Sequence, residues 1–334
     1  MGSAAPSTNI LLYGAGSIGG VYLYQLLQAG CTVTAVCRSN YSIVKEHGFR
    51  LSSVRYGNVT YYPTSVVRDI AECSNERFDF VLVCTKSFPG SNPSLPDQLR
   101  PILVDRPETA IVLAQNGINI EAEVATAYPE NPILSGVIYC PAVQTGPGEI
   151  EYPEILNLFE LGTYPSSGVP AAHKAAAQRF TDLMIKGGGE AEVHEDIQVA
   201  RWNKLLLNAA WNPIGALTLT SDGDFLTTSD PYAHDLAWGV MMEIVEVAEV
   251  LGVPGVTADV AEKKFSIAKR RAEMGTGREM SMLQDVRQGR SFEVEAILGN
   301  VVRLAKEKRV GIPRLETLYA LAKARHWALA KKTL

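Results

Sequence analysis

A polar stripe runs along one predicted helix in the stretch RWNKLLLNAAWNP, residues 201–213. Lys204, Asn208 and Asn212 are spaced four apart, which places them on one helix face within about 80° of arc. A buried ammonium group needs a ligand, a carboxylate or water, and burial lowers a lysine pKa towards the range of a general acid. Carboxamides bind hydroxyl and carboxylate groups. The stripe therefore fits either an active site or a structural network that bridges two domains.

A glycine-rich turn near the start of the chain predicts a dinucleotide site. Its sequence, GAGSIGG, has the G-x-G-x-x-G spacing and lies between an apolar strand and an amphipathic helix. Glycines at these places allow a tight turn, a close approach to a pyrophosphate and tight helix packing, and the helix N-terminus attracts phosphate. The alternative is a plain structural turn. The predicted cofactor contacts in this turn are Gly14, Ala15, Gly16, Ser17, Ile18 and Gly19.

The end of the next strand indicates which dinucleotide is bound. An NAD site carries an acidic residue there for the ribose 2′-hydroxyl, whereas this chain has Arg38 followed by Ser39. A guanidinium group fits a 2′-phosphate, so the sequence predicts NADPH. A solvated arginine at a strand end is the alternative. Hydride transfer to a ketone also requires a proton, which Lys204 could supply.

The elements that must position these residues fall into two halves. Short apolar strands alternate with helices in the first half, which predicts a parallel sheet covered on both faces. Residues 146–162 read as a hairpin-like extension of that sheet, and the three glycines within residues 186–195 read as the joint. We therefore expect an α/β Rossmann-type domain over residues 9–190, followed by an all-α substrate and catalytic domain over residues 195–330.

Composition narrows the function further. The chain has 334 residues and a net charge of −5, which disfavours a nucleic-acid partner. Five cysteines without a CxxC pair indicate buried free thiols, and neither a disulfide framework nor a metal site is expected. No apolar run is long enough to cross a membrane, and the first eight residues resemble a disordered lead-in, not a signal peptide. We expect a cytoplasmic enzyme.

Several motifs together resemble the ketopantoate reductase family. They are GAGSIGG, CTK, AQNG, KLLLNAAWNP and SMLQDVRQGRSFEVE, and they follow the family order from about residue 9 to about residue 313. The resemblance implies an NADPH-binding domain, a helical C-terminal domain and an active site between them. It also implies reduction of 2-dehydropantoate to pantoate, a step of pantothenate biosynthesis. A homodimer is a further possibility, since the family includes dimers and monomers.

The resemblance also implies a role for single residues. Lys204 matches the proton donor, and Glu293 matches a residue near the nicotinamide and the reacting centre. The residues that match cofactor contacts are Lys86, Asn116 and Ala142, and those that match substrate contacts are Asn116, Asn208, Asn212 and Ser281. Each has a plainer alternative, such as a surface lysine at 86, a loop cap at 116 or a turn residue at 281. For Glu293 it is a carboxylate in the first turn of a helix capped by Ser291.

Two positions carry further expectations. Asp222 stands where the family often has an asparagine that contacts the substrate, so its carboxylate either repels an acidic substrate or sits in a turn. This difference weakens the case for 2-dehydropantoate, which stays the default substrate by resemblance. Another 2-oxo acid, ketone or imine is the alternative, and a non-catalytic NADPH-binding protein is the third possibility. Pro213 is expected to end or bend the helix at Asn212.

Overall fold

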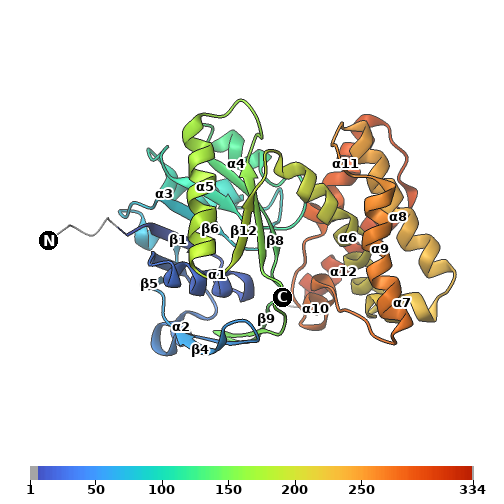
Figure 1. The fold of residues 1–334 in the computed structure, drawn as a ribbon, viewed down its shortest axis with the longest axis horizontal. Coiled ribbons are helices and arrows are strands. Elements are labelled where there is room, and N and C mark those ends of the chain that lie inside the picture. Colours follow the sequence, from blue (N-terminus) through green and yellow to red (C-terminus); the bar gives the residue numbers. More distant parts are fainter. Residues whose placement is uncertain (1–6, 333–334) are drawn as a thin grey trace. The chain divides into compact units, whose positions relative to one another are not determined.

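The structure is a computed structural model that describes residues 7–332, and the chain divides into two compact units (Figure 1). The first unit contains residues up to 86, residues 90–115 and residues 121–197. The second contains residues 87–89, residues 116–120 and the chain from residue 198. Of the expected lead-in, residues 1–6 lie outside the described residues. Ser7 and Thr8 are bound in place, since Ser7 Oγ donates to Gly30 O and Thr8 O accepts from Thr32 N.

An eight-stranded sheet forms the centre of the first unit. Six of its strands are parallel, and their order is that of a Rossmann sheet. β11 pairs antiparallel with β8 and parallel with β12, so two strands of opposite direction close one side. Across the sheet the strands are β12 (Glu190–Val193), β11 (Leu158–Thr163), β8 (Ile133–Tyr139), β7 (Ala110–Leu113), β6 (Phe80–Val83), β1 (Asn9–Tyr13), β2 (Thr32–Val36) and β5 (Ser65–Val67).

A second, four-stranded sheet corrects the expected extension of the main one. The two strands of the segment 146–162 do not pair with each other: the first, β10, forms a hairpin with the preceding β9 and also pairs with β3, from a hairpin earlier in the chain. Only β11, from the end of the same segment, joins the main sheet. The order is β4 (Gly57–Tyr61), β3 (Phe49–Ser53), β10 (Glu149–Tyr152) and β9 (Val143–Gly146).

Helices complete the first unit. α1 and α5 pack against each other, and α3 packs against α4 and η1. Their bounds are α1 (Ser17–Gln28), α2 (Tyr41–His47), η1 (Ile70–Cys73), α3 (Leu95–Leu103), α4 (Ala122–Ala127) and α5 (Ala171–Lys186).

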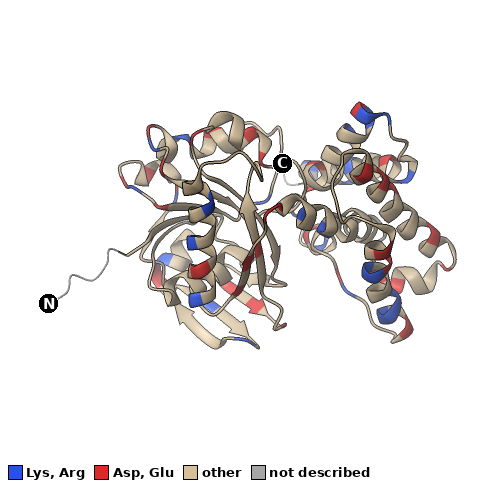
Figure 2. Ribbon diagram, turned by 45° about the horizontal axis from the view of Figure 1, so that its top comes forward, with Lys and Arg blue, Asp and Glu red and all other residues tan. Residues whose placement is uncertain are grey.

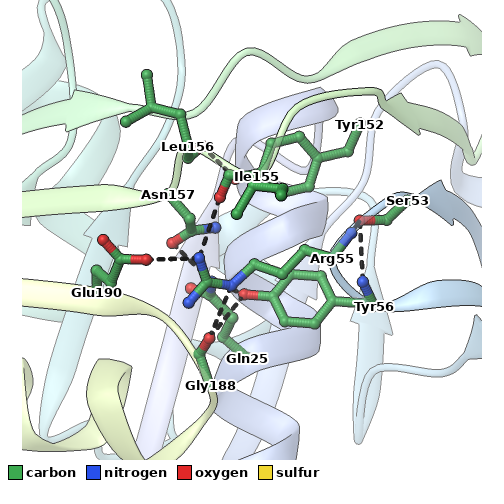
Figure 3. A network of polar contacts seen from close by, with 10 residues as sticks. All are labelled: Gln25, Ser53, Arg55, Tyr56, Tyr152, Ile155, Leu156, Asn157, Gly188 and Glu190. Carbon is green, nitrogen blue, oxygen red and sulfur yellow. Dashed lines mark hydrogen bonds and ion pairs between the residues drawn. The ribbon is translucent and has the colours of Figure 1, made fainter.

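A polar network fixes the turn between β3 and β4 to the rest of the first unit (Figure 3). Arg55 donates to Glu190 at 2.7 Å and to the carbonyls of Ile155 and Gly188. Gly188 belongs to the three-glycine turn, which connects α5 to β12 inside the first unit and is not a joint between domains. A Cβ on Gly187 would lie 2.1 Å from the carbonyl oxygen of Gln25, so this turn needs glycine for packing.

The second unit is helical, as the sequence predicts. Its apolar core includes Val240, Met241, Ile244, Val245 and Val247 of α8. The elements are α6 (Ile197–Thr218), α7 (Asp222–Thr228), α8 (Tyr232–Val250), α9 (Ala258–Glu273), α10 (Ser281–Arg287), the π-helical turn η2 (Glu295–Gly299), α11 (Asn300–Lys308) and α12 (Pro313–Lys332).

Pro213 does not end the helix. α6 continues five residues beyond it, to Thr218. Trp211, Ile214 and Ala216 on both sides of the proline are buried in the core, and this packing outweighs the loss of one backbone hydrogen bond.

The predicted fold class is therefore confirmed: a Rossmann-type α/β unit followed by an all-α unit. Acidic and basic residues are interspersed over both (Figure 2). Within residues 7–332, no helix combines the length and apolar character that a membrane crossing needs.

Candidate active site

The three glycines of the turn between β1 and α1 differ in the space around them. Gly14 has φ +107°, and a Cβ there would lie 2.4 Å from Thr85 N. A Cβ on Gly19 would lie 2.1 Å from Gly14 O. A Cβ on Gly16, in contrast, would meet nothing closer than Gln144 Oε1 at 4.0 Å. The protein's own packing therefore needs Gly14 and Gly19, whereas Gly16 leaves open space at the N-terminus of α1.

Arg38 lies two residues beyond β2, exposed at the carboxyl edge of the sheet. Its guanidinium group donates to the hydroxyl of Tyr13, and its Cζ lies 5.4 Å from the centroid of that ring. Asn40, close by and buried, donates to the carbonyl of Ala15 at 2.9 Å and so ties this strand end to the glycine turn. Through Asn40, the strand end that carries Arg38 is therefore linked to the glycine turn.

Two further predicted cofactor contacts follow strands of the main sheet. Lys86 comes three residues after β6, and Ala142 comes three residues after β8; both are half-buried. The N–H of Ala142 donates to Cys140 O at 2.8 Å, which forms a tight turn before β9. Ser17 and Ile18 begin α1, and Ala15 lies within the turn.

In the second unit, Lys204 and Asn116 lie in direct contact. Lys204 Nζ donates to Asn116 Oδ1 at 2.9 Å, although 88 residues separate them. Lys204 is half-buried on α6, and Asn116 is half-buried in the segment that follows β7. The predicted proton donor is thus paired with a predicted substrate contact.

The segment that carries Asn116 is held tightly by three other elements of the second unit. Gly117 O accepts from the buried Arg201 at 2.7 Å, and the carbonyl of Ala296 in η2 accepts from Ile118 N at 3.1 Å. Asn300 donates to Ile118 O at 2.6 Å. Gly117 has φ +97°, and a Cβ there would lie 2.3 Å from Ala296 O, so only glycine fits. Asn116 is therefore a preorganised side chain.

The two carboxamides of α6 differ in their surroundings. Asn212 is buried, and its Oδ1 accepts from Ser281 Oγ and from Met282 N, both at 3.1 Å. Asn208 is half-buried, and its carboxamide has no hydrogen-bond partner among the described residues. Ser281 is exposed and begins α10. Contact with Ser281 places α10 against the polar stripe.

Glu293 lies one residue before the helical segment that begins at Val294. The expectation of a helix capped by Ser291 is therefore wrong by two residues, and Glu293 itself precedes the helix, its carbonyl accepting from Ile297 N. Its side chain is buried, and Oε1 accepts from Ser87 N at 3.0 Å. A buried carboxylate close to a helix N-terminus is stabilised by that N–H and by the helix dipole.

Asp222 does not have the geometry of a substrate contact. Its side chain is fully buried, with Oδ2 2.6 Å from the guanidinium of Arg271. Oδ1 accepts from the N–H groups of Gly223 and Arg278. Both oxygens are therefore used inside the protein, and the family's asparagine is replaced by a neutralised structural carboxylate.

The predicted site residues thus form two groups. The glycine turn, Arg38, Lys86 and Ala142 belong to the first unit, and Asn116, Lys204, Asn208, Asn212, Ser281 and Glu293 belong to the second. Sequence reasoning missed Arg201 and Gly117. Arg201 lies on the same helix face as Lys204, and Gly117 follows Asn116 directly, so both signals were available.

Comparison with known proteins finds one protein family in both units. The family model described as "Ketopantoate reductase PanE/ApbA" matches residues 10–165, and its C-terminal counterpart matches residues 196–326. A solved structure of 2-dehydropantoate 2-reductase from Methylococcus capsulatus is 36% identical, with a TM-score of 0.81 over 96% of this chain and 97% of that one. The 2-dehydropantoate 2-reductase of a Nostoc species is 27% identical over 92% of both chains.

A more distant neighbour shares the fold alone. The structure of D-mandelate dehydrogenase with NADH and anilino(oxo)acetate has a TM-score of 0.81 at 22% identity, and the match covers 97% of this chain and 100% of that one.

Proposed function

Because the chain belongs to the ketopantoate reductase PanE/ApbA family and is an oxidoreductase of that type, we propose that it reduces the ketone of a 2-oxo acid with NADPH. 2-Dehydropantoate is the first candidate substrate, and pantoate is its product. The observation that carries this proposal is the hydrogen bond from Lys204 Nζ to Asn116 Oδ1 at 2.9 Å, which aims an ammonium group at a preorganised carboxamide.

Lys204 is the proposed proton donor. NADPH, when bound, would supply a hydride for the carbonyl carbon, and the charge that develops on the ketone oxygen needs both stabilisation and a proton. An ammonium group held at one place by Asn116 provides both without reorganisation. Asn116 then keeps an amide N–H pair to orient the substrate.

The remaining polar groups of the stripe bind the substrate in this proposal. Asn208 has a free carboxamide, and Asn212 keeps its Nδ2 donor because only its Oδ1 is used within the described residues. Ser281 adds a hydroxyl group beside Asn212. Together they offer several donors to a carboxylate and a hydroxyl, the groups of a hydroxylated 2-oxo acid. Glu293 is proposed to position substrate and cofactor.

The first unit is proposed to hold NADPH. The open space beside Gly16 fits a pyrophosphate, and exposed Arg38 fits a 2′-phosphate. Lys86 and Ala142 are proposed as further cofactor contacts.

We do not expect the carboxylate of Asp222 to repel an acidic substrate. Arg271 neutralises its carboxylate, which is fully buried. The difference from the family asparagine is therefore accommodated locally, and 2-dehydropantoate stays the first candidate.

A substrate panel tests this proposal. Purified protein is mixed with NADPH or NADH and with 2-dehydropantoate, an aromatic 2-oxo acid or pyruvate, and loss of the reduced nicotinamide absorbance is followed. We expect the highest kcat/KM for NADPH with 2-dehydropantoate. A higher value for another 2-oxo acid would move the substrate assignment to that compound, and binding of NADPH without turnover on any ketone would contradict an enzymatic role.

A further inference from the structure

We propose that Arg68 is a second specificity-determining residue for the cofactor, and that it clamps the 2′-phosphate of NADPH together with Arg38. This inference rests on the proposed use of NADPH. Arg68 comes one residue after β5, a strand that the sequence had not revealed as a neighbour of β2.

The sheet register brings the two arginines to the same edge. β2 and β5 are adjacent and parallel, Val36 pairs with Val67, and Cys37 N donates to Val67 O at 2.9 Å. Arg38 and Arg68 therefore follow neighbouring strands at their carboxyl ends, the edge at which open α/β sheets bind ligands. Both side chains are exposed.

Each guanidinium group is oriented by a tyrosine ring. Arg68 Cζ lies 4.2 Å from the centroid of Tyr41, and Arg38 Cζ lies 5.4 Å from that of Tyr13. Tyr41 N donates to the carbonyl of Arg38 at 3.3 Å, which links the residue that supports Arg68 to the backbone of Arg38. A stacked guanidinium loses part of its freedom, and the N–H groups that it does not donate to protein partners such as the Tyr13 hydroxyl stay available for a phosphate.

A single arginine does not balance the negative charges expected near the 2′-phosphate. A phosphate monoester carries about −1.5 to −2 charges at neutral pH. Near Arg38, the carboxylate of Asp69 opposes such an anion, and Glu72 belongs to the same short helix. Both carboxylates serve as helix caps, because Asp69 accepts from Ala71 N and Glu72 accepts from Asp69 N. Lys45 adds a third cation, with Nζ 2.8 Å from the Tyr41 hydroxyl.

Binding titrations of the full-length protein test the clamp without relying on activity. Dissociation constants for NADPH and NADH are measured by nucleotide fluorescence for the wild type, Arg38→Ala, Arg68→Ala, Arg68→Lys and Arg77→Ala. Arg77 is the matched control, since it is an exposed arginine paired with Glu108 and precedes β6 at its opposite, amino end. Thermal unfolding of each variant checks that it folds.

We expect Arg68→Ala to weaken NADPH binding about tenfold and leave NADH binding within about twofold, as loss of a charged hydrogen bond to phosphate implies. Arg68→Lys should recover part of the loss, and Arg77→Ala should have no effect. An unchanged NADPH to NADH ratio in Arg68→Ala, with a changed ratio in Arg38→Ala, would overturn the clamp alone. Equal affinity of the wild type for both nucleotides would overturn the NADPH assignment and the clamp together.

Discussion

Lys204 Nζ and Asn116 Oδ1 lie 2.9 Å apart and join helix α6 to the segment that follows strand β7. Around this pair, Arg201 and Ala296 hold the backbone of Gly117 and Ile118 in place. Asn116 therefore holds the ammonium group of Lys204, and the fixed backbone after it holds Asn116 in turn. A proton donor that must act from one direction requires such an arrangement.

Replacement of Asn116 tests the value of that positioning. In Asn116→Ala the ammonium group loses its 2.9 Å partner, and we expect kcat with 2-dehydropantoate to fall about 10²-fold, since small misplacements of a reacting group cost that much. Asn203→Ala is the control, because Asn203 is the neighbour of Lys204 on α6 but donates towards Gly255 O. Steady-state kinetics distinguish the two, and equal kcat values in both variants would remove Asn116 from the mechanism.

The glycine turn offers a matched pair of substitutions. Gly19→Ala would place a Cβ 2.1 Å from Gly14 O, and we expect it to destabilise the protein by about 2 kcal/mol or more, as overpacking does. Gly16→Ala has room within the protein and should unfold at the wild-type temperature, yet bind NADPH at least about tenfold more weakly because the methyl group occupies the pyrophosphate position. Thermal unfolding in the absence of nucleotide measures the effect on stability, and titration with NADPH measures the effect on binding. Wild-type NADPH affinity in Gly16→Ala would refute the predicted phosphate contact.

Asp222 is predicted to affect stability and not substrate binding. Asp222→Ala leaves Arg271 without its partner and should cost about 2–3 kcal/mol, less than the roughly 3–5 kcal/mol of fully buried pairs because Arg271 is partly exposed. The KM for the 2-oxo acid should stay within about twofold. Denaturant unfolding and steady-state kinetics of one preparation report both quantities. A large change in KM without a loss of stability would restore Asp222 as a substrate contact.

Glu295 is predicted to stabilise the π-helical turn in a pH-dependent way. Burial alone would raise the pKa of Glu295, but hydrogen bonds from Arg303, Tyr319 and Lys323 outweigh it and lower that pKa. A lowered pKa in the folded state means that the stabilisation is complete above the unfolded-state pKa of about 4.3 and disappears as the pH falls through the folded-state pKa. Glu295→Gln should therefore cost about 1 kcal/mol at pH 7, and this cost should shrink as the pH falls through the folded-state pKa, measured by denaturant unfolding. A cost that does not change with pH would exclude the carboxylate charge as its source.

Local periodicity was enough to place Lys204, Asn208 and Asn212 on one face, because a helix repeats over a few residues. Contacts between parts of the chain that are distant in sequence could not be predicted from local periodicity. Ser87 and Glu293 are 206 residues apart, and nothing in either stretch indicates their hydrogen bond. The same limit explains Asp222, whose meaning depends on Arg271 from another helix. It also explains the second sheet, in which β10 pairs with the much earlier β3.

The central claim is that Lys204 delivers the proton to the ketone oxygen, and Lys204→Ala tests it most directly. NADPH affinity and turnover of 2-dehydropantoate are measured for this variant and the wild type under the same conditions. We predict that the NADPH dissociation constant stays within about twofold while kcat falls by about 10² to 10⁴, the contribution of a positioned general acid. Turnover at the wild-type rate in Lys204→Ala would contradict the assignment.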